Sequence, residues 1–151
     1  MKRLIPLVIA GLFASASLAQ DVTTPETDPL FLTADMADLS EFLWKKRPVL
    51  VFADGEDDPA FVAQMEYLHA REEELRLRDV IVLTDTDPAG RSAMRLKLRP
   101  RGFMLVLMDK EGRVELRKPF PWDVREITRS IDKMPLRQRE IRENNEREVI
   151  R

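Results

Sequence analysis

The chain of 151 residues contains no cysteine. Without a thiol it can form no disulfide bond, and it can use no thiolate nucleophile, CxxC redox centre, iron-sulfur cluster or cysteine-ligated zinc. Histidine is almost absent as well: His69 is the only one, so a cluster of histidine metal ligands is excluded. The fold must therefore be held together by packing alone, and thiol redox chemistry is excluded as its activity.

Glycine is also scarce, with five residues in the whole chain. They are too widely scattered to build a phosphate-binding loop or a dinucleotide fingerprint. His69 falls at the margin of the apolar face of a predicted helix, which favours a structural role over a place in a serine triad. The sequence therefore predicts no cofactor and no catalytic residue.

The N-terminus has the three parts of a secretory signal peptide. Basic Lys2 and Arg3 precede a short apolar run, and small residues follow it up to Ala19. We predict a signal peptide over residues 1–19, cleaved after Ala19, and a periplasmic or secreted protein. The apolar run is shorter than the roughly 20 residues that span a bilayer, so no stable membrane anchor is predicted.

The remaining chain is mildly acidic. The signal peptide contains two of the 25 basic residues and none of the 27 acidic ones, which leaves a net charge of −4 on 132 residues. That balance gives no general case for nucleic-acid binding, and the length suits one compact domain. Residues 20–30 are polar and contain two prolines, which predicts a flexible linker.

Four short segments are predicted as strands. Three are apolar without alternation, as expected of strands covered on both faces, and the fourth follows a turn as a hairpin partner. These segments are residues 49–53, 80–83, 103–108 and 114–117. Because a helix connects the first two strands, we expect them to run parallel through a right-handed crossover.

Helices are predicted between and after the strands, over residues 59–77, 88–98, 124–134 and 135–151. Asp58 as N-cap and Pro59 at the first position begin the first of them. Asp38 is predicted to cap a short helix ahead of the first strand, with Trp44 packing beside that helix. The last helix is dense in both charges, so we expect it to lie across the surface or to project from it.

This order, β-α-β-α-β-β-α, resembles the thioredoxin fold. A finer resemblance rests on three stretches: Trp44-x-x-Arg47-Pro48-Val49-Leu50-Val51-Phe52-Ala53, Gly102-Phe103 leading into Leu105-Val106-Leu107-Met108, and Ile131-Asp132-Lys133-Met134-Pro135-x-Arg137-x-x-Glu140. They are similar to domain-of-unknown-function family 4174, found in exported bacterial proteins and in some extracellular-matrix and sushi-repeat proteins. The resemblance covers roughly residues 44–142, implies a thioredoxin-like or peroxiredoxin-like fold without an established activity, and supplies no catalytic residue. We predict that the thioredoxin-like domain spans residues 31–134.

Carboxylates follow the first two predicted strands. Asp54, Asp57 and Asp58 come after one strand, and Asp85 and Asp87 come at the end of the next. Because parallel strands place their carboxyl ends at one edge, these groups could together hold a divalent cation, directly or in a metal-assisted enzyme. The simpler interpretation is that they cap helices, and no calcium-loop spacing is present.

Basic residues form two further candidate sites. A run without an intervening acid contains Arg91, Arg95, Lys97, Arg99 and Arg101, and it could bind a polyanion. Arg91 and Arg95 are predicted to share a helix face. A solvated helix surface is the plainer interpretation.

Two more arginines, Arg137 and Arg139, lie in the stretch that resembles the family. We expect them to dock the last helix onto the domain or onto a partner. The sequence thus predicts an exported, non-catalytic thioredoxin-like domain that binds a protein or an acidic polysaccharide of the cell envelope. A divalent-metal protein remains the alternative.

Overall fold

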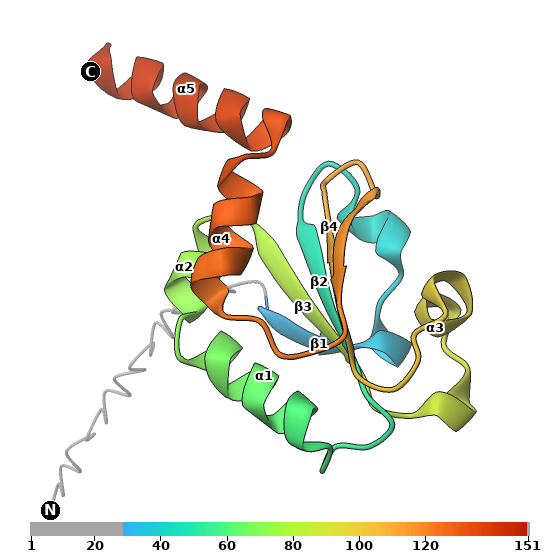
Figure 1. The fold of residues 1–151 in the computed structure, drawn as a ribbon. Helices are drawn as coiled ribbons and strands as arrows, with labels where there is room; N and C mark the ends of the chain where they lie inside the picture. The colour runs from blue at the N-terminus through green and yellow to red at the C-terminus, as the bar shows by residue number, and fades with distance from the viewer. Residues whose placement is uncertain (1–28, 151) are drawn as a thin grey trace, which may run out of the picture.

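The computed structural model describes residues 29–150, so the predicted signal peptide and most of the predicted linker lie outside the described residues. Figure 1 shows a central sheet with helices on both faces and a last helix that points away from the body. The sheet has the order β1-β3-β2-β4-β5. Its strands are β1 (Phe31–Thr33), β2 (Arg47–Phe52), β3 (Val80–Asp85), β4 (Met104–Met108) and β5 (Val114–Lys118).

The strand directions confirm the predicted parallel pair and the predicted hairpin. β2 and β3 are parallel, whereas β4 is antiparallel to both β2 and β5. β1 was not predicted, because three residues are too few to show a period of two. It pairs in parallel with β3, and Leu30, which the predicted linker included, is buried in the core beside it.

The two faces of the sheet have separate cores. Val49 and Val51 of β2 pack on one face, and Leu50 and Phe52 pack on the other, as the alternation of a strand requires. The first face is covered by α1 (Pro59–His69), α2 (Glu72–Arg76) and α4 (Val124–Asp132). The second is covered by shorter segments, α3 (Ala93–Leu98) and the 3-10 turns η1 (Ala34–Met36) and η2 (Leu39–Phe42).

The prediction of one continuous helix over residues 59–77 is wrong. Asp58 caps it and Pro59 begins it as predicted, but α1 ends at His69 and α2 begins at Glu72. Three consecutive glutamates form the first turn of α2, where acidic side chains complement the helix dipole. That local preference for a new N-terminus is consistent with the break.

The predicted helix over residues 88–98 is also divided. A 3-10 turn, η3 (Pro88–Gly90), comes first, and Arg91 follows it in the left-handed conformation with φ 47°. Ser92 then caps α3, because its hydroxyl accepts the N–H of Arg95 at 3.1 Å. Arg91 and Arg95 therefore do not share a helix face, contrary to the prediction.

The segment before β2 departs from the prediction at its end. Asp38 caps η2 as expected, since its carboxylate accepts the N–H of Ser40 at 2.9 Å. Trp44 does not pack beside that turn: it lies in the left-handed region with φ 64°, and its side chain is 65 % exposed. Its N–H donates to the carbonyl of Lys110 at 2.7 Å, which fixes the backbone there.

The last helix, α5 (Pro135–Val149), begins at Pro135 directly after α4 and projects from the body in Figure 1. Within residues 29–150 no helix is both long enough and apolar enough to cross a membrane.

Candidate functional site

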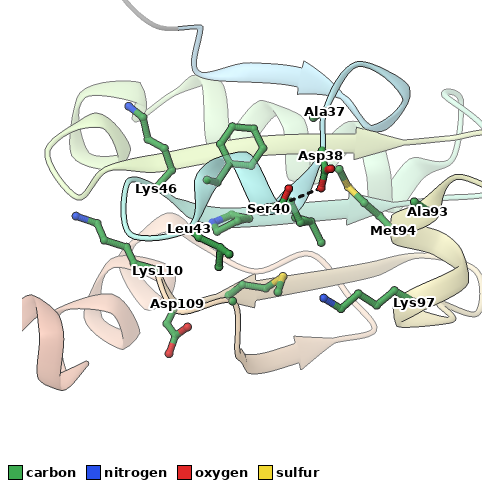
Figure 2. A pocket seen from close by; sticks show the side chains of 15 residues that line it. Ala37, Asp38, Ser40, Leu43, Lys46, Ala93, Met94, Lys97, Asp109 and Lys110 are labelled. Atoms are coloured by element: carbon green, nitrogen blue, oxygen red, sulfur yellow. Dashed lines mark hydrogen bonds between the residues drawn. The ribbon is translucent and has the colours of Figure 1, made fainter.

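An apolar pocket of about 410 Å³ lies on the thinly covered face of the sheet. Figure 2 shows it between the segment that contains η2 and the helix α3. Leu39, Phe42 and Leu43 contribute from one side and Met94 from the other, while Met108 at the end of β4 lies between them. The pocket exists because two short 3-10 turns and a six-residue helix cannot cover this face as fully as three α-helices cover the opposite one.

Charged side chains surround the pocket. Lys46, Lys97 and Lys110 line it together with Asp38 and Asp109. Lys110 is engaged elsewhere, since its amine lies 2.8 Å from both Asp79 and Glu140. Figure 2 shows the Lys97 chain extending from α3 across the pocket, whereas the amine of Lys110 points away from it.

Both pocket carboxylates are already bound by backbone groups. Asp38 caps η2, and Asp109 accepts the N–H groups of Glu111 and Arg113 and the guanidinium of Arg113. Burial alone would raise the pKa of Asp109, but the hydrogen bonds from Arg113 lower it below its usual value. The N–H of Ser40 and, less strongly, the positive charge of Lys97 lower the pKa of Asp38. The amine of Lys46 points away from the pocket in Figure 2, so Lys97 is the lysine that extends across it.

The structure brings Asp85 and Arg95 together at the carboxyl edge of the sheet. The Arg95 guanidinium lies 2.9 Å from the Asp85 carboxylate and also donates to the carbonyl of Ala53, directly before the Asp54 loop. Ser92 donates its hydroxyl to the other Asp85 oxygen. Burial would raise the pKa of Asp85, but these hydrogen bonds lower it below its usual value.

This ion pair changes the interpretation of two candidate residues. Arg95 is 10 % exposed and stacks over the ring of Phe52, with 5.4 Å from its guanidinium carbon to the ring centroid. It is a structural residue rather than part of an exposed basic run. Asp85 already has a cation, and a second one would have to displace Arg95.

The other predicted metal ligands are dispersed along the same edge. Asp58 accepts the N–H of Ala60 at 2.8 Å and Asp87 accepts that of Ala89 at 3.1 Å, so both serve as helix caps. Asp54 and Asp57 are exposed in the loop between β2 and α1. Within residues 29–150 no group of three or more histidine, aspartate or glutamate side chains is arranged to hold a metal ion.

The predicted basic residues separate into exposed and engaged groups. Arg91, Arg99 and Arg101 are exposed on either side of α3, and none of their side chains forms an ion pair within the described part of the chain. Arg139 is exposed on α5. Arg137 is instead largely buried between Asp132, at 3.5 Å, and Glu140, at 3.4 Å, so it braces the junction of α4 and α5.

A buried cluster joins α5 to the sheet. Arg47 is fully buried, and its guanidinium donates to Glu140 at 3.0 Å and to the carbonyl of Arg78 at 2.9 Å. Lys110 bridges Glu140 and Asp79. Glu140 therefore docks the helix onto the sheet, while Arg137, one of the two predicted arginines, joins it to α4. The pKa of Glu140 would be raised by burial, but the hydrogen bonds from Lys110 and Arg47 lower it below the usual value.

His69 lies away from these groups. Its ring stacks on Phe31 with centroids 4.1 Å apart, and its Nδ1 lies 2.9 Å from Glu72. The structure thus places it at the end of α1 against β1, in a packing role.

The pocket was missed from the sequence, because it is formed where predicted helices are broken. The only available signal was the set of apolar residues around Asp38 and in residues 93–98, which had been assigned to ordinary helix faces.

Comparisons with solved structures agree with the fold. The chain is 19 % identical to Prx1a from Plasmodium yoelii, with a TM-score of 0.50, and the match covers 64 % of this chain and 77 % of that one. Thioredoxin peroxidase I of the same organism matches with the same identity and TM-score, over 64 % of this chain and 76 % of that one. No curated protein matches the chain significantly. The protein therefore has a thioredoxin-like fold, and its sequence contains no cysteine.

The family is shown by the sequence itself. Residues 38–140 match the domain of unknown function DUF4174, which covers more than half of the chain. The matched region begins at the Asp38 cap and ends at Glu140, so it contains every pocket-lining residue except Ala37 and both ends of the buried Arg47 cluster. This chain belongs to the DUF4174 family.

Proposed function

We propose that this domain acts in the cell envelope by binding an anionic partner, a protein or an acidic polysaccharide, rather than by catalysis. One observation carries the proposal: Arg91, Arg99 and Arg101 are exposed around α3 and have no acidic partner within residues 29–150. These three exposed side chains, the arginine surface, flank α3, and no ion pair within residues 29–150 competes with their attraction for carboxylate and sulfate groups.

The surrounding backbone supports this interpretation. Arg91 and Arg99 both adopt the left-handed conformation, with φ of 47° and 49°, and they lie at the two ends of α3. Arg95, between them, fastens α3 to Asp85 and to the carbonyl of Ala53. The buried arginine therefore holds the helix that presents the exposed ones.

The experiment compares retention on heparin, as an acidic polysaccharide, and on immobilised polyglutamate, as an acidic polypeptide. We expect Arg91→Gln/Arg99→Gln/Arg101→Gln to elute at clearly lower salt than the wild-type protein, because each neutralised contact weakens the salt-dependent attraction. The control, Arg125→Gln/Arg129→Gln/Arg142→Gln, removes the same charge from exposed positions on α4 and α5.

If the control elutes at the wild-type salt concentration, binding is assigned to Arg91, Arg99 and Arg101. The matrix that retains the wild-type protein up to the higher salt concentration indicates the class of partner. Equal shifts of the two triple variants would show only an effect of net charge. That result would contradict the proposal, as would elution of the wild-type protein from both columns below the physiological salt concentration.

A further inference from the structure

The apolar pocket between η2 and α3 is separate from the exposed arginines, none of which lines it. Its volume of about 410 Å³ lies within the range of small-molecule sites, which are concave and mostly apolar with a few polar groups. Its deep wall belongs to the folded core: Met94 and Met108 are 2 % and 1 % exposed and also pack in the second core cluster. The cavity is therefore already formed in the folded domain.

The lining defines the body of the ligand. Leu39, Phe42 and Leu43 present the apolar side chains that a ligand can contact, while Met94 and Met108 close the cavity from the core. A sugar unit would leave hydroxyl groups unpaired against this surface, which costs free energy. An aliphatic chain would instead remove apolar area from water.

The mouth defines the head group. Lys97 is exposed on α3 and extends over the opening in Figure 2, whereas the amine of Lys46 points away from the pocket. Asp109 is paired with Arg113, and the Asp38 carboxylate accepts the N–H of Ser40 and also attracts Lys97. A carboxylate at the mouth would thus meet the Lys97 ammonium, which forms no ion pair within residues 29–150.

From this pattern we infer that the pocket binds a single-chain anionic amphiphile: an aliphatic chain fills the cavity, and its terminal carboxylate lies beside Lys97. A medium-chain fatty acid has this chemistry. The inference does not depend on the arginine surface, because Arg91, Arg99 and Arg101 do not line the pocket.

The test is isothermal titration of the protein with decanoate below its micellar concentration, with decanol and acetate as comparison probes. We expect saturable decanoate binding at one site, weaker decanol binding and no acetate binding. Lys97→Gln should weaken decanoate roughly threefold, as expected for an exposed ion pair, and leave decanol unchanged. Lys133→Gln, on an exposed lysine at the end of α4, is the matched control and should change neither.

A second variant tests the cavity itself. Ala93 is exposed at the start of α3 and lines the pocket, so Ala93→Phe should obstruct it and abolish the binding of both decanoate and decanol. Ala89→Phe places the same ring at an exposed residue of η3 outside the pocket lining and should bind normally. Circular dichroism measures whether each variant is folded. Absence of decanoate binding, or equal binding by folded Ala93→Phe, would overturn the inference.

Discussion

At the scale of single residues, charged side chains in this protein serve mainly to fasten elements. Arg47 is fully buried at the start of β2, Arg95 fixes α3 to the carboxyl edge of the sheet, and Arg78 makes two hydrogen bonds to Asp132 on α4, of 2.9 Å and 2.8 Å. Hydrogen bonds in which both groups are charged are stronger than neutral ones, and paired Arg-carboxylate contacts also fix orientation. They tie elements together in a chain that has no disulfide.

Glu140 offers the sharpest test of this role. Glu140→Gln removes the carboxylate that compensates buried Arg47 and Lys110, so we expect the free energy of unfolding to fall by about 3 kcal/mol. The measurement is urea unfolding followed by circular dichroism. Glu143→Gln, on the exposed part of the same helix, should cost less than about 0.5 kcal/mol because its pair with Arg147 is exposed. Similar losses in the two variants would refute the assignment.

At the scale of elements, α5 has two parts with different roles. Its first turns contain Arg137 and Glu140, which contact α4, β2 and the turn after β4. From Arg142 to Ile150 every residue is exposed. The beginning of the charged helix is therefore fastened to the sheet and to α4, whereas its second half is exposed.

Two truncations separate these parts. A chain that ends after Arg142 keeps the Glu140 cluster, so its free energy of unfolding should stay within about 1 kcal/mol of the full chain. A chain that ends after Met134 loses the cluster and leaves Arg47 buried without its carboxylate, which should cost about 3 kcal/mol or more. Urea unfolding of both proteins checks this. A large loss of unfolding free energy in the chain that ends after Arg142 would mean that the projecting part contributes to the stability of the fold.

The success of sequence-based prediction also varied by element. β2, β3 and β4 were predicted because strands buried on both faces are continuous apolar runs, and α1 because Asp58-Pro59 is a strong start signal. The breaks at residues 70–71 and 91–92 were missed, since helical spacing of apolar residues continues across a short interruption. The pocket depends on the second break and on η2, so it could not be predicted with the fold.

Ion pairs between residues far apart in the sequence could not be predicted either. Arg47 and Glu140 both lie in the stretches that resemble the family, but they are 93 residues apart in sequence. Spacing along a chain indicates partners three or four residues apart on a helix, and it carries no information about partners on different elements. Only the packed fold shows that Glu140, together with Asp79, compensates two buried cations.

At the scale of the whole molecule, the two faces of the sheet are covered unequally. Three α-helices close one core, whereas the other face is covered by short turns and α3 and keeps an open pocket. The exposed arginines flank α3, which covers that same face. The longer helices thus cover one side of the sheet, and the two proposed binding surfaces lie at the short segments that cover the other.

The ion pairs that join the elements also determine how the molecule responds to acid. Hydrogen bonds from cationic side chains lower the pKa of Asp85, Asp132 and Glu140 below the ordinary values of 3.8 for aspartate and 4.5 for glutamate. A lowered pKa in the folded state means that the unfolded chain takes up protons first as the pH falls. The stabilisation is therefore complete above about pH 5 and is lost as the pH falls through the folded-state pKa values.

Glu115 opposes this trend, because burial and the neighbouring Asp109 raise its pKa, but it is one exposed group against several. We expect the free energy of unfolding to be level from pH 7 to pH 5 and then to fall by up to about 1.4 kcal/mol per pH unit for each proton taken up. Urea unfolding at pH 7, 5, 4 and 3 measures this slope. Because Gln cannot titrate, Glu140→Gln should show a shallower acid slope than wild type, and an identical slope in both proteins would contradict the role given to this carboxylate.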